Sequence, residues 1–314
     1  MIKAKPFLKW AGGKNQLLKQ FENYYPDELR NGKIKKYIEP FIGGGAVFFD
    51  VIQKYDIQSS YISDVNPNLI LTYRVIQQRP DILLERLERY QREYDGSDQE
   101  KRKTLFLSTR ELFNSNQPQI NHRLINIGYK KLSDSCIDAA AQLIFLNKTC
   151  FNGLFRLNSK GRFNVPFGKY KKPNILDSEN ILSVSKILQR TEIMLSDYGY
   201  CFDIADEKTF IYFDPPYKPI SKTANFTNYA GFQFTDTEQI KLASFFRKLD
   251  IEKHSKLMLS NSDPKNENPD DSFFEKIYDG YNLHHVYANR MINCDAKKRG
   301  QIRELVITNY KNTE

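Results

Sequence analysis

The chain has 314 residues, and its 47 Lys and Arg residues against 38 Asp and Glu residues give a net charge of +9. A 40% apolar fraction with 22 Phe and 19 Tyr excludes a disordered chain, and the length suits one large or two modest domains. No run of about 18 apolar residues or signal peptide is found, so we expect a soluble, cytoplasmic protein without a membrane partner. The four cysteines form no CxxC pair, which argues against a disulfide framework and a metal site.

The first predicted elements follow the pattern of a doubly wound α/β sheet. A short strand at 37–42 runs into three glycines at 43–45, and a helix is expected at 46–51. A second strand at 60–64 then ends in an acidic residue. A strand, a glycine-rich turn, a helix and a second strand are the opening of such a sheet.

From residue 67 the pattern becomes helical and strongly basic. Residues 67–178 carry 19 Lys and Arg residues against 11 Asp and Glu residues, which is 8 of the 9 net charges. Within them, residues 147–172 contain seven basic residues, five aromatic residues and no acid. A solvated surface is the alternative, but cations interleaved with aromatic rings suit nucleic acid, because they neutralise phosphates and stack on bases.

Strands return after residue 173, at 209–213, 256–260 and 304–308. The sequence therefore predicts an α/β fold split by an insertion. Residues 1–66 and 179–314 are expected to form the sheet domain, and 67–178 a helical domain.

Three motifs carry the predicted chemistry. The glycines at 43–45 let the backbone pass close to a ligand, and Asp64 at the end of the next strand can accept bonds from ribose hydroxyls. A structural turn with a capping Asp explains the same pattern. Residues 9–14 (KWAGGK) lack phosphate-loop spacing, and by themselves they also fit an N-terminal turn.

The sharpest motif is Asp214-Pro215-Pro216-Tyr217, directly after the apolar strand 209–213. The prolines stiffen the chain and remove two donors, which leaves the Asp214 carboxylate and the Pro215 carbonyl as acceptors beneath an aromatic ring. An exocyclic amine on a planar base fits this pocket. Accepting both of its hydrogens makes the nitrogen nucleophilic toward a methyl group held in line on a sulfonium.

Together, residues 7–14, 39–45, Asp64, 151–170 and 214–217 resemble the DNA adenine-N6 methyltransferases of the Dam type (D12 class, alpha group), as does the segment 224–227. The resemblance covers nearly the whole chain. It implies a Rossmann-like domain that binds S-adenosylmethionine without a metal, and an inserted helical domain that binds double-stranded DNA. It also implies a bacterial or phage enzyme without an obligate protein partner, although a cognate restriction endonuclease acting on the same site remains an open partner.

The resemblance implies roles for individual residues. Lys14 would pair with the methionine carboxylate and Asp64 with the ribose, while Asp214 would hold the amine of a flipped adenine stacked on Tyr217. The implied cofactor contacts are Trp10, Lys14, Glu39, Phe41, Gly43, Gly45, Asp64, Asp197, Tyr198 and Asp214. The implied catalytic residues are Asp214, Pro215, Pro216 and Tyr217. The implied DNA contacts are Lys9, Phe151, Asn152, Leu154, Arg156, Pro166 and Tyr170.

Residues 150–158 and 161–170, called the recognition segment below, are similar to the branch that reads GATC. There, Lys9 would face the first G, and Arg156 the G of the third base pair. Leu154 and Pro166 would contact a thymine methyl, and Phe151 would wedge the base stack. A related site such as GATATC stays open.

The sequence leaves other substrates and a function without catalysis as alternatives. The same pocket could methylate cytosine N4, an RNA adenine or a glutamine amide, but Ser or Asn is then typical in place of Asp214. Cytosine C5 chemistry needs a thiol after Pro, and no cysteine of this sequence follows one. A DNA-binding regulator without turnover is disfavoured by the complete motif set.

Overall fold

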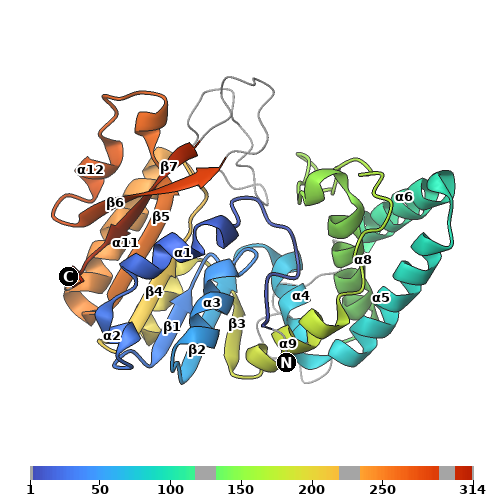
Figure 1. The fold of residues 1–314 in the computed structure, drawn as a ribbon, viewed down its shortest axis with the longest axis horizontal. Helices are drawn as coiled ribbons and strands as arrows, with labels where there is room; N and C mark the ends of the chain where they lie inside the picture. Colours follow the sequence, from blue (N-terminus) through green and yellow to red (C-terminus); the bar gives the residue numbers. More distant parts are fainter. Residues whose placement is uncertain (1–2, 117–131, 219–233, 290–300, 313–314) are drawn as a thin grey trace.

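The computed structural model describes residues 3–116, 132–218, 234–289 and 301–312, and its centre is a seven-stranded sheet (Figure 1). The strand order is β3-β2-β1-β4-β5-β7-β6. The strands are β1 (Lys36–Glu39), β2 (Ser59–Asp64), β3 (Thr191–Leu195), β4 (Thr209–Phe213), β5 (Lys256–Ser262), β6 (Asn282–Asn289) and β7 (Gln301–Thr308).

The first five strands are parallel, and β7 lies antiparallel between β5 and β6. The strand order reverses between β1 and β4, and open α/β sheets bind ligands at the carboxyl ends of the strands at such a point. The predicted Rossmann-like α/β class is confirmed. The first strand ends at Glu39, earlier than the expected 37–42, because Pro40 has no N–H to continue the ladder.

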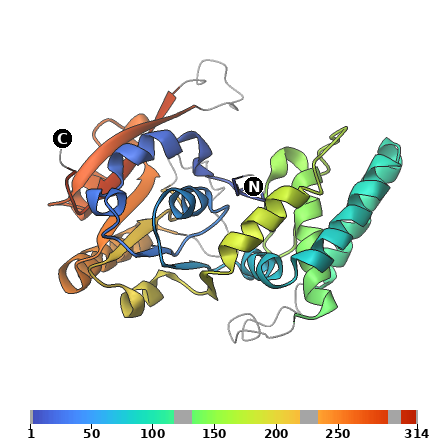
Figure 2. The ribbon, with the colours of Figure 1, turned by 60° about the horizontal axis from the view of Figure 1, so that its bottom comes forward.

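A second group of helices lies beside the sheet, on the side of β3, and the N-terminal segment runs between the two parts (Figures 1 and 2). These helices are α4 (Pro67–Gln78), α5 (Pro80–Asp95), α6 (Gln99–Asn116), α8 (Asp134–Thr149) and α9 (Ser178–Leu188). Helix α4 contacts both the sheet, at β3, and α8 at the centre of the helical group. It therefore joins the two parts of the molecule.

The remaining helices flank the sheet and its loops. They are α1 (Leu18–Phe21), α2 (Asp27–Arg30), α3 (Ala46–Lys54), α10 (Cys201–Ile204), α11 (Asp236–Lys253) and α12 (Phe273–Ile277), with short 3-10 turns at Lys14–Gln16, Glu22–Tyr24, Phe151–Gly153, Tyr198–Tyr200 and Pro264–Asn266. The family-like segment 224–227 lies outside the described residues. Within the described ranges, no helix is long and apolar enough to cross a membrane, and no cluster of metal-binding side chains occurs.

Candidate active site

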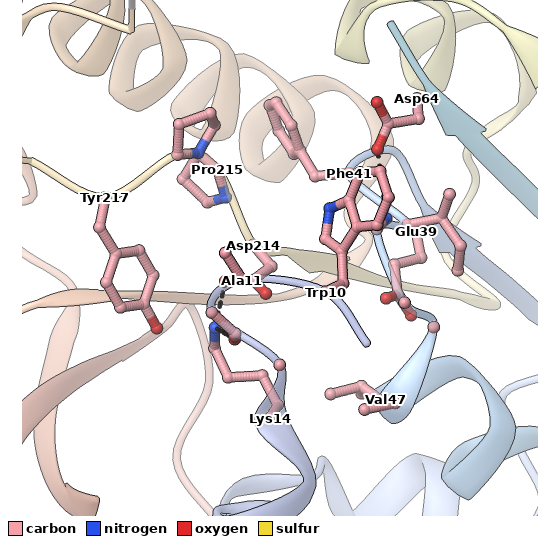
Figure 3. Close-up of a pocket in the computed structure, with 18 of the residues that line it drawn as sticks. Trp10, Ala11, Lys14, Glu39, Phe41, Val47, Asp64, Asp214, Pro215 and Tyr217 are labelled. Carbon is pink, nitrogen blue, oxygen red and sulfur yellow. Dashed lines mark hydrogen bonds and ion pairs between the residues drawn. The ribbon is translucent and has the colours of Figure 1, made fainter. Parts of the chain in front are cut away.

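A cavity of about 1610 Å³ lies at the carboxyl ends of the parallel strands, where the N-terminal segment covers the switch point (Figure 3). Sites for one small ligand are typically about 300–1,000 Å³, so this space has room for a cofactor and a nucleobase together. All the predicted cofactor and catalytic residues line it, although they come from five separate segments of the chain. Because the strands are parallel, the residues that follow them lie together at one edge of the sheet.

The glycine-rich turn forms one wall of the cavity. Gly43 and Gly45 have φ values of +44° and +74°, which L side chains rarely adopt. A Cβ on Gly43 would lie 2.8 Å from the Trp10 indole, and one on Gly45 would lie 2.7 Å from the Tyr73 hydroxyl. Glycine is therefore required both by the backbone conformation and by the close approach of Trp10.

Asp64 at the end of β2 holds this turn and faces the cavity. Its carboxylate accepts hydrogen bonds from the backbone N–H groups of Gly43, at 3.2 Å, and Asn66, at 2.9 Å. Burial raises the pKa of Asp64 to about 6, although these bonds favour the charged form. At neutral pH the side chain is therefore mostly an acceptor-only carboxylate.

Asp197 and Tyr198 follow β3 on the same edge of the sheet. The exposed Asp197 carboxylate accepts from the Gly199 N–H at 2.8 Å and begins a short 3-10 turn. The Tyr198 ring packs 5.8 Å from the ring of Phe41, which follows β1. The two rings form an aromatic wall of the cavity next to the Asp197 carboxylate. The resemblance implies that the adenine of the cofactor binds at this place.

The Asp214-Pro215-Pro216-Tyr217 segment leaves β4, whose five residues are all buried. Its backbone is held by Gln239 of α11, whose amide donates to the Pro216 carbonyl at 3.0 Å and accepts from Asn261 at 3.1 Å. Among the described residues, no donor reaches the Pro215 carbonyl. That carbonyl is an acceptor left for a ligand.

Asp214 is fixed through one carboxylate oxygen. Its Oδ1 receives Lys14 Nζ at 2.8 Å and the Ser260 hydroxyl at 3.0 Å, and within the described chain nothing donates to Oδ2 (Figure 3). The side chain is 21% exposed, so a ligand can reach it. Burial raises the pKa of Asp214, while Lys14 and Ser260 favour its charged form.

The Lys14 ammonium interacts with three acidic side chains, those of Glu39, Asp214 and Glu304. Its side chain is 4% exposed, and Nζ also lies 4.5 Å from the centre of the Tyr217 ring. Burial raises the pKa of Glu39, Asp214 and Glu304, and Lys14 opposes the rise in each case. Glu39 is 2% exposed and accepts from the Tyr37 hydroxyl, so it lies in the floor of the cavity.

The recognition segment follows α8, and several of its side chains are exposed to solvent. Phe151 and Leu154 are 53% and 38% exposed, which is unusual for apolar residues beside a buried helix. Asn152 between them has a φ of +58°. Its N–H donates to the Tyr170 hydroxyl at 3.1 Å. This geometry displays an apolar side chain on a rigid turn.

Lys9 joins this surface from the N-terminal segment. Its backbone N–H and carbonyl both bond at 2.9 Å to the amide of Asn147, which also donates to the Gly153 carbonyl. The Lys9 ammonium lies 5.4 Å from the Tyr170 ring centre. One buried Asn therefore fixes Lys9 against the recognition turn.

Arg156 and Pro166 are also exposed, on a loop that folds back on itself. Asn164 accepts from Arg156 Nε at 2.8 Å, which orients the guanidinium. Phe155 is 6% exposed, and its ring stacks 5.3 Å from the ring of Trp10. The loop and the cofactor cavity therefore share a wall.

Sequence analysis missed several polar residues that hold the site. They are Asn147, Gln239, Ser260, Asn261 and Glu304. Ser260 and Asn261 carried a signal, since polar residues directly after the apolar strand core 257–259 had to face the ligand edge. The other three carried none, because their contacts depend on tertiary packing.

Comparisons with known proteins show the family to which the chain belongs. Residues 10–292 match the family described as D12 class N6 adenine-specific DNA methyltransferase. The Type II methyltransferase M.MjaIII of Methanocaldococcus jannaschii is 47% identical over 310 residues, which cover 98% of this chain and all of the relative. The Type II methyltransferase M1.LlaDCHI of Lactococcus lactis is 36% identical over 99% of this chain and 97% of the relative.

A DNA adenine methylase of Vibrio cholerae is 33% identical over 98% of this chain and 96% of the relative. These matches run through the sheet, the cavity motifs and the recognition segment alike. The chain belongs to the D12 class of N6 adenine-specific DNA methyltransferases.

Proposed function

We propose that the protein transfers the methyl group of S-adenosylmethionine to N6 of a flipped adenine within GATC in duplex DNA. The observation that carries the mechanism is the pair of acceptors at the end of β4, Asp214 Oδ2 and the Pro215 carbonyl. Two acceptors match the two N–H groups of the adenine amine. When the acceptors hold both N–H groups, the nitrogen lone pair is drawn out of ring conjugation and the amine becomes nucleophilic. Placement of the methyl group in line with this nitrogen then supplies the remaining part of catalysis.

The cofactor would lie along the remaining walls of the cavity. Asp64 is a carboxylate at the end of β2, which suits the ribose hydroxyls, and Asp197 with Tyr198 suits the adenine. Lys14 is buried at the opposite end, where its ammonium suits the methionine carboxylate. The cofactor would supply an activated methyl group, and the residues of the chain would position that group against the adenine amine.

The helical group and the recognition loop would hold the DNA, with residues 67–178 as the recognition domain and 1–66 with 179–314 as the catalytic domain. A stacked adenine cannot reach a cavity at the sheet edge, so the base must leave the helix. Phe151 is the exposed ring available to fill the gap, and Asn152 beside it would contact the partner strand. Lys9, Leu154, Pro166 and Tyr170 lie on the same surface.

Arg156 is proposed to read a guanine, because it is exposed and only its Nε is bonded to Asn164, so among the described residues its two terminal nitrogens have no acceptor and suit O6 and N7. Arg156→Ala is expected to reduce discrimination at that base pair by about 1–3 kcal/mol. The measurement is kcat/KM on duplexes substituted at each position in turn. Arg92→Ala, an exposed arginine on α5, is the control. An equal loss on every duplex would reduce Arg156 to a phosphate contact.

The proposal as a whole is tested by sequencing with modified-base detection after plasmid DNA is incubated with the purified protein and S-adenosylmethionine. We expect N6-methyladenine at GATC. Methylation confined to another motif would refute the specificity, and methylated cytosine would refute the reaction. The relatives named Type II methyltransferases favour a restriction–modification role, in which a cognate endonuclease cuts the same site.

A further inference from the structure

Tyr217, the residue proposed to stack on the target adenine, is held by a partner from a distant strand. Its hydroxyl donates to Glu304 Oε2 of β7 at 2.5 Å. Lys14 Nζ lies over the ring, 4.5 Å from its centre. The ring is therefore fixed at its hydroxyl end and over one face, while Tyr217 remains partly exposed to the cavity.

Glu304 is a rigid anchor because it lies within the sheet. It pairs with Ser262 of β5 on one side and with Val286 of β6 on the other. A shift of one residue in this register would turn its side chain to the opposite face. The position of the carboxylate is thus set by two strand ladders and not by the loop that carries Tyr217.

A carboxylate at this place has an energetic cost. Burial raises the pKa of Glu304 and the nearby Asp214 charge adds to that rise, while Lys14 and the Tyr217 hydroxyl favour the ionised form. The strand continues with the buried apolar residues Leu305, Val306 and Ile307, so the carboxylate lies next to the core. What the carboxylate adds is a strong, directional acceptor for one hydroxyl.

We propose that Glu304 is a positioning residue that holds the Tyr217 ring in the orientation needed to stack on the flipped adenine. It acts through the Tyr217 hydroxyl and does not touch the substrate. The inference rests on the proposed stacking role of Tyr217. A free ring samples several rotamers, so a fixed ring places the adenine amine at Asp214 more often and removes an ordering cost from the reaction.

The test compares Glu304→Ala, Glu304→Gln and Tyr217→Phe with the wild-type enzyme. Glu304→Ala and Tyr217→Phe are each expected to lower kcat by about 10²-fold, the loss typical of a misplaced reactant, with a much smaller change in KM for DNA. Glu304→Gln keeps an acceptor oxygen and should stay within about tenfold of wild type. The double variant Tyr217→Phe with Glu304→Ala should lose no more than either single change.

A spectroscopic readout separates positioning from general damage. With 2-aminopurine at the target position, the bound wild-type enzyme is expected to quench the flipped base through the stacked ring. Glu304→Ala should give brighter bound DNA, and Glu304→Gln should resemble wild type. Glu252→Gln, which changes an exposed glutamate on α11, is the control for removal of a negative charge.

Wild-type kcat and fluorescence in Glu304→Ala would overturn the inference, as would a loss in Glu304→Gln as large as in Glu304→Ala. If Glu304→Ala does not fold, Tyr217→Phe still decides, because wild-type kcat and fluorescence in that variant show that the hydroxyl anchor is dispensable. Failure of the proposed function is distinct, since the wild-type enzyme itself would then leave DNA unmethylated.

Discussion

Replacing Asp214 with Ala is expected to lower kcat for methyl transfer by about 10³-fold or more, while duplex DNA still binds. The reason is that Asp214 Oδ1 is committed to Lys14 and Ser260, so Oδ2 is the carboxylate oxygen available to the adenine amine. Alanine removes that acceptor, and the Pro215 carbonyl alone cannot hold both N–H groups. The measurement is transfer of a labelled methyl group, with DNA affinity determined in parallel.

The matched control for Asp214 is Asp279→Asn, which alters an exposed carboxylate after α12 and should keep full activity. DNA affinity should survive in Asp214→Ala because the basic recognition segment lies on other elements. Turnover at the wild-type level would remove Asp214 from the mechanism. Joint loss of DNA binding and turnover would show instead that Asp214 supports the fold of the site.

Replacing Lys14 with Met is expected to have the second large effect, which is a shift in the pH dependence of kcat. Burial raises the pKa of Glu39, Asp214 and Glu304, and Lys14 opposes the rise in all three. Without that cation the pKa of Asp214 rises further, and a protonated Asp214 no longer accepts from the amine. The acid limb of kcat therefore moves to higher pH, with about a tenfold loss for each unit by which the pKa exceeds the assay pH.

The Lys14→Met profile is measured in single turnovers at saturating S-adenosylmethionine, with Lys19→Met, an exposed lysine on α1, as the control. Activity should recover as the pH is raised. A weaker affinity for S-adenosylmethionine is also expected, because the ammonium is proposed to bind the methionine carboxylate. An acid limb at the wild-type pH would contradict the link between Lys14 and the ionisation of Asp214.

The central strands were predictable because burial on both faces demands a continuous apolar run. The predicted strand 209–213 is β4, and the predicted strand 256–260 lies within β5. The edge strand β6 was not predicted, because one of its eight residues, Val286, is buried, and the rest carry no strict alternation. Edge strands are shaped by the neighbour on one side, which the local sequence does not contain.

The chemistry of the site was predictable where the type of a residue and its position in the sequence together indicate its role. An acid at the end of a strand and two prolines after a buried run have few physical explanations. The partners of those residues were not predictable. Lys14 contacts Asp214, and Glu304 contacts Tyr217, only because segments distant in the chain meet at one edge of the sheet. Such contacts depend on sheet order and register.

The most direct test of the account is a crystal structure of the protein with a GATC duplex and a non-reactive analogue of S-adenosylmethionine. The decisive quantities are the distances from N6 of the target adenine to Asp214 Oδ2 and to the Pro215 carbonyl. We predict that both are about 3 Å, with the base stacked on Tyr217. An extruded adenine bound elsewhere, with neither acceptor within reach of N6, would contradict the account.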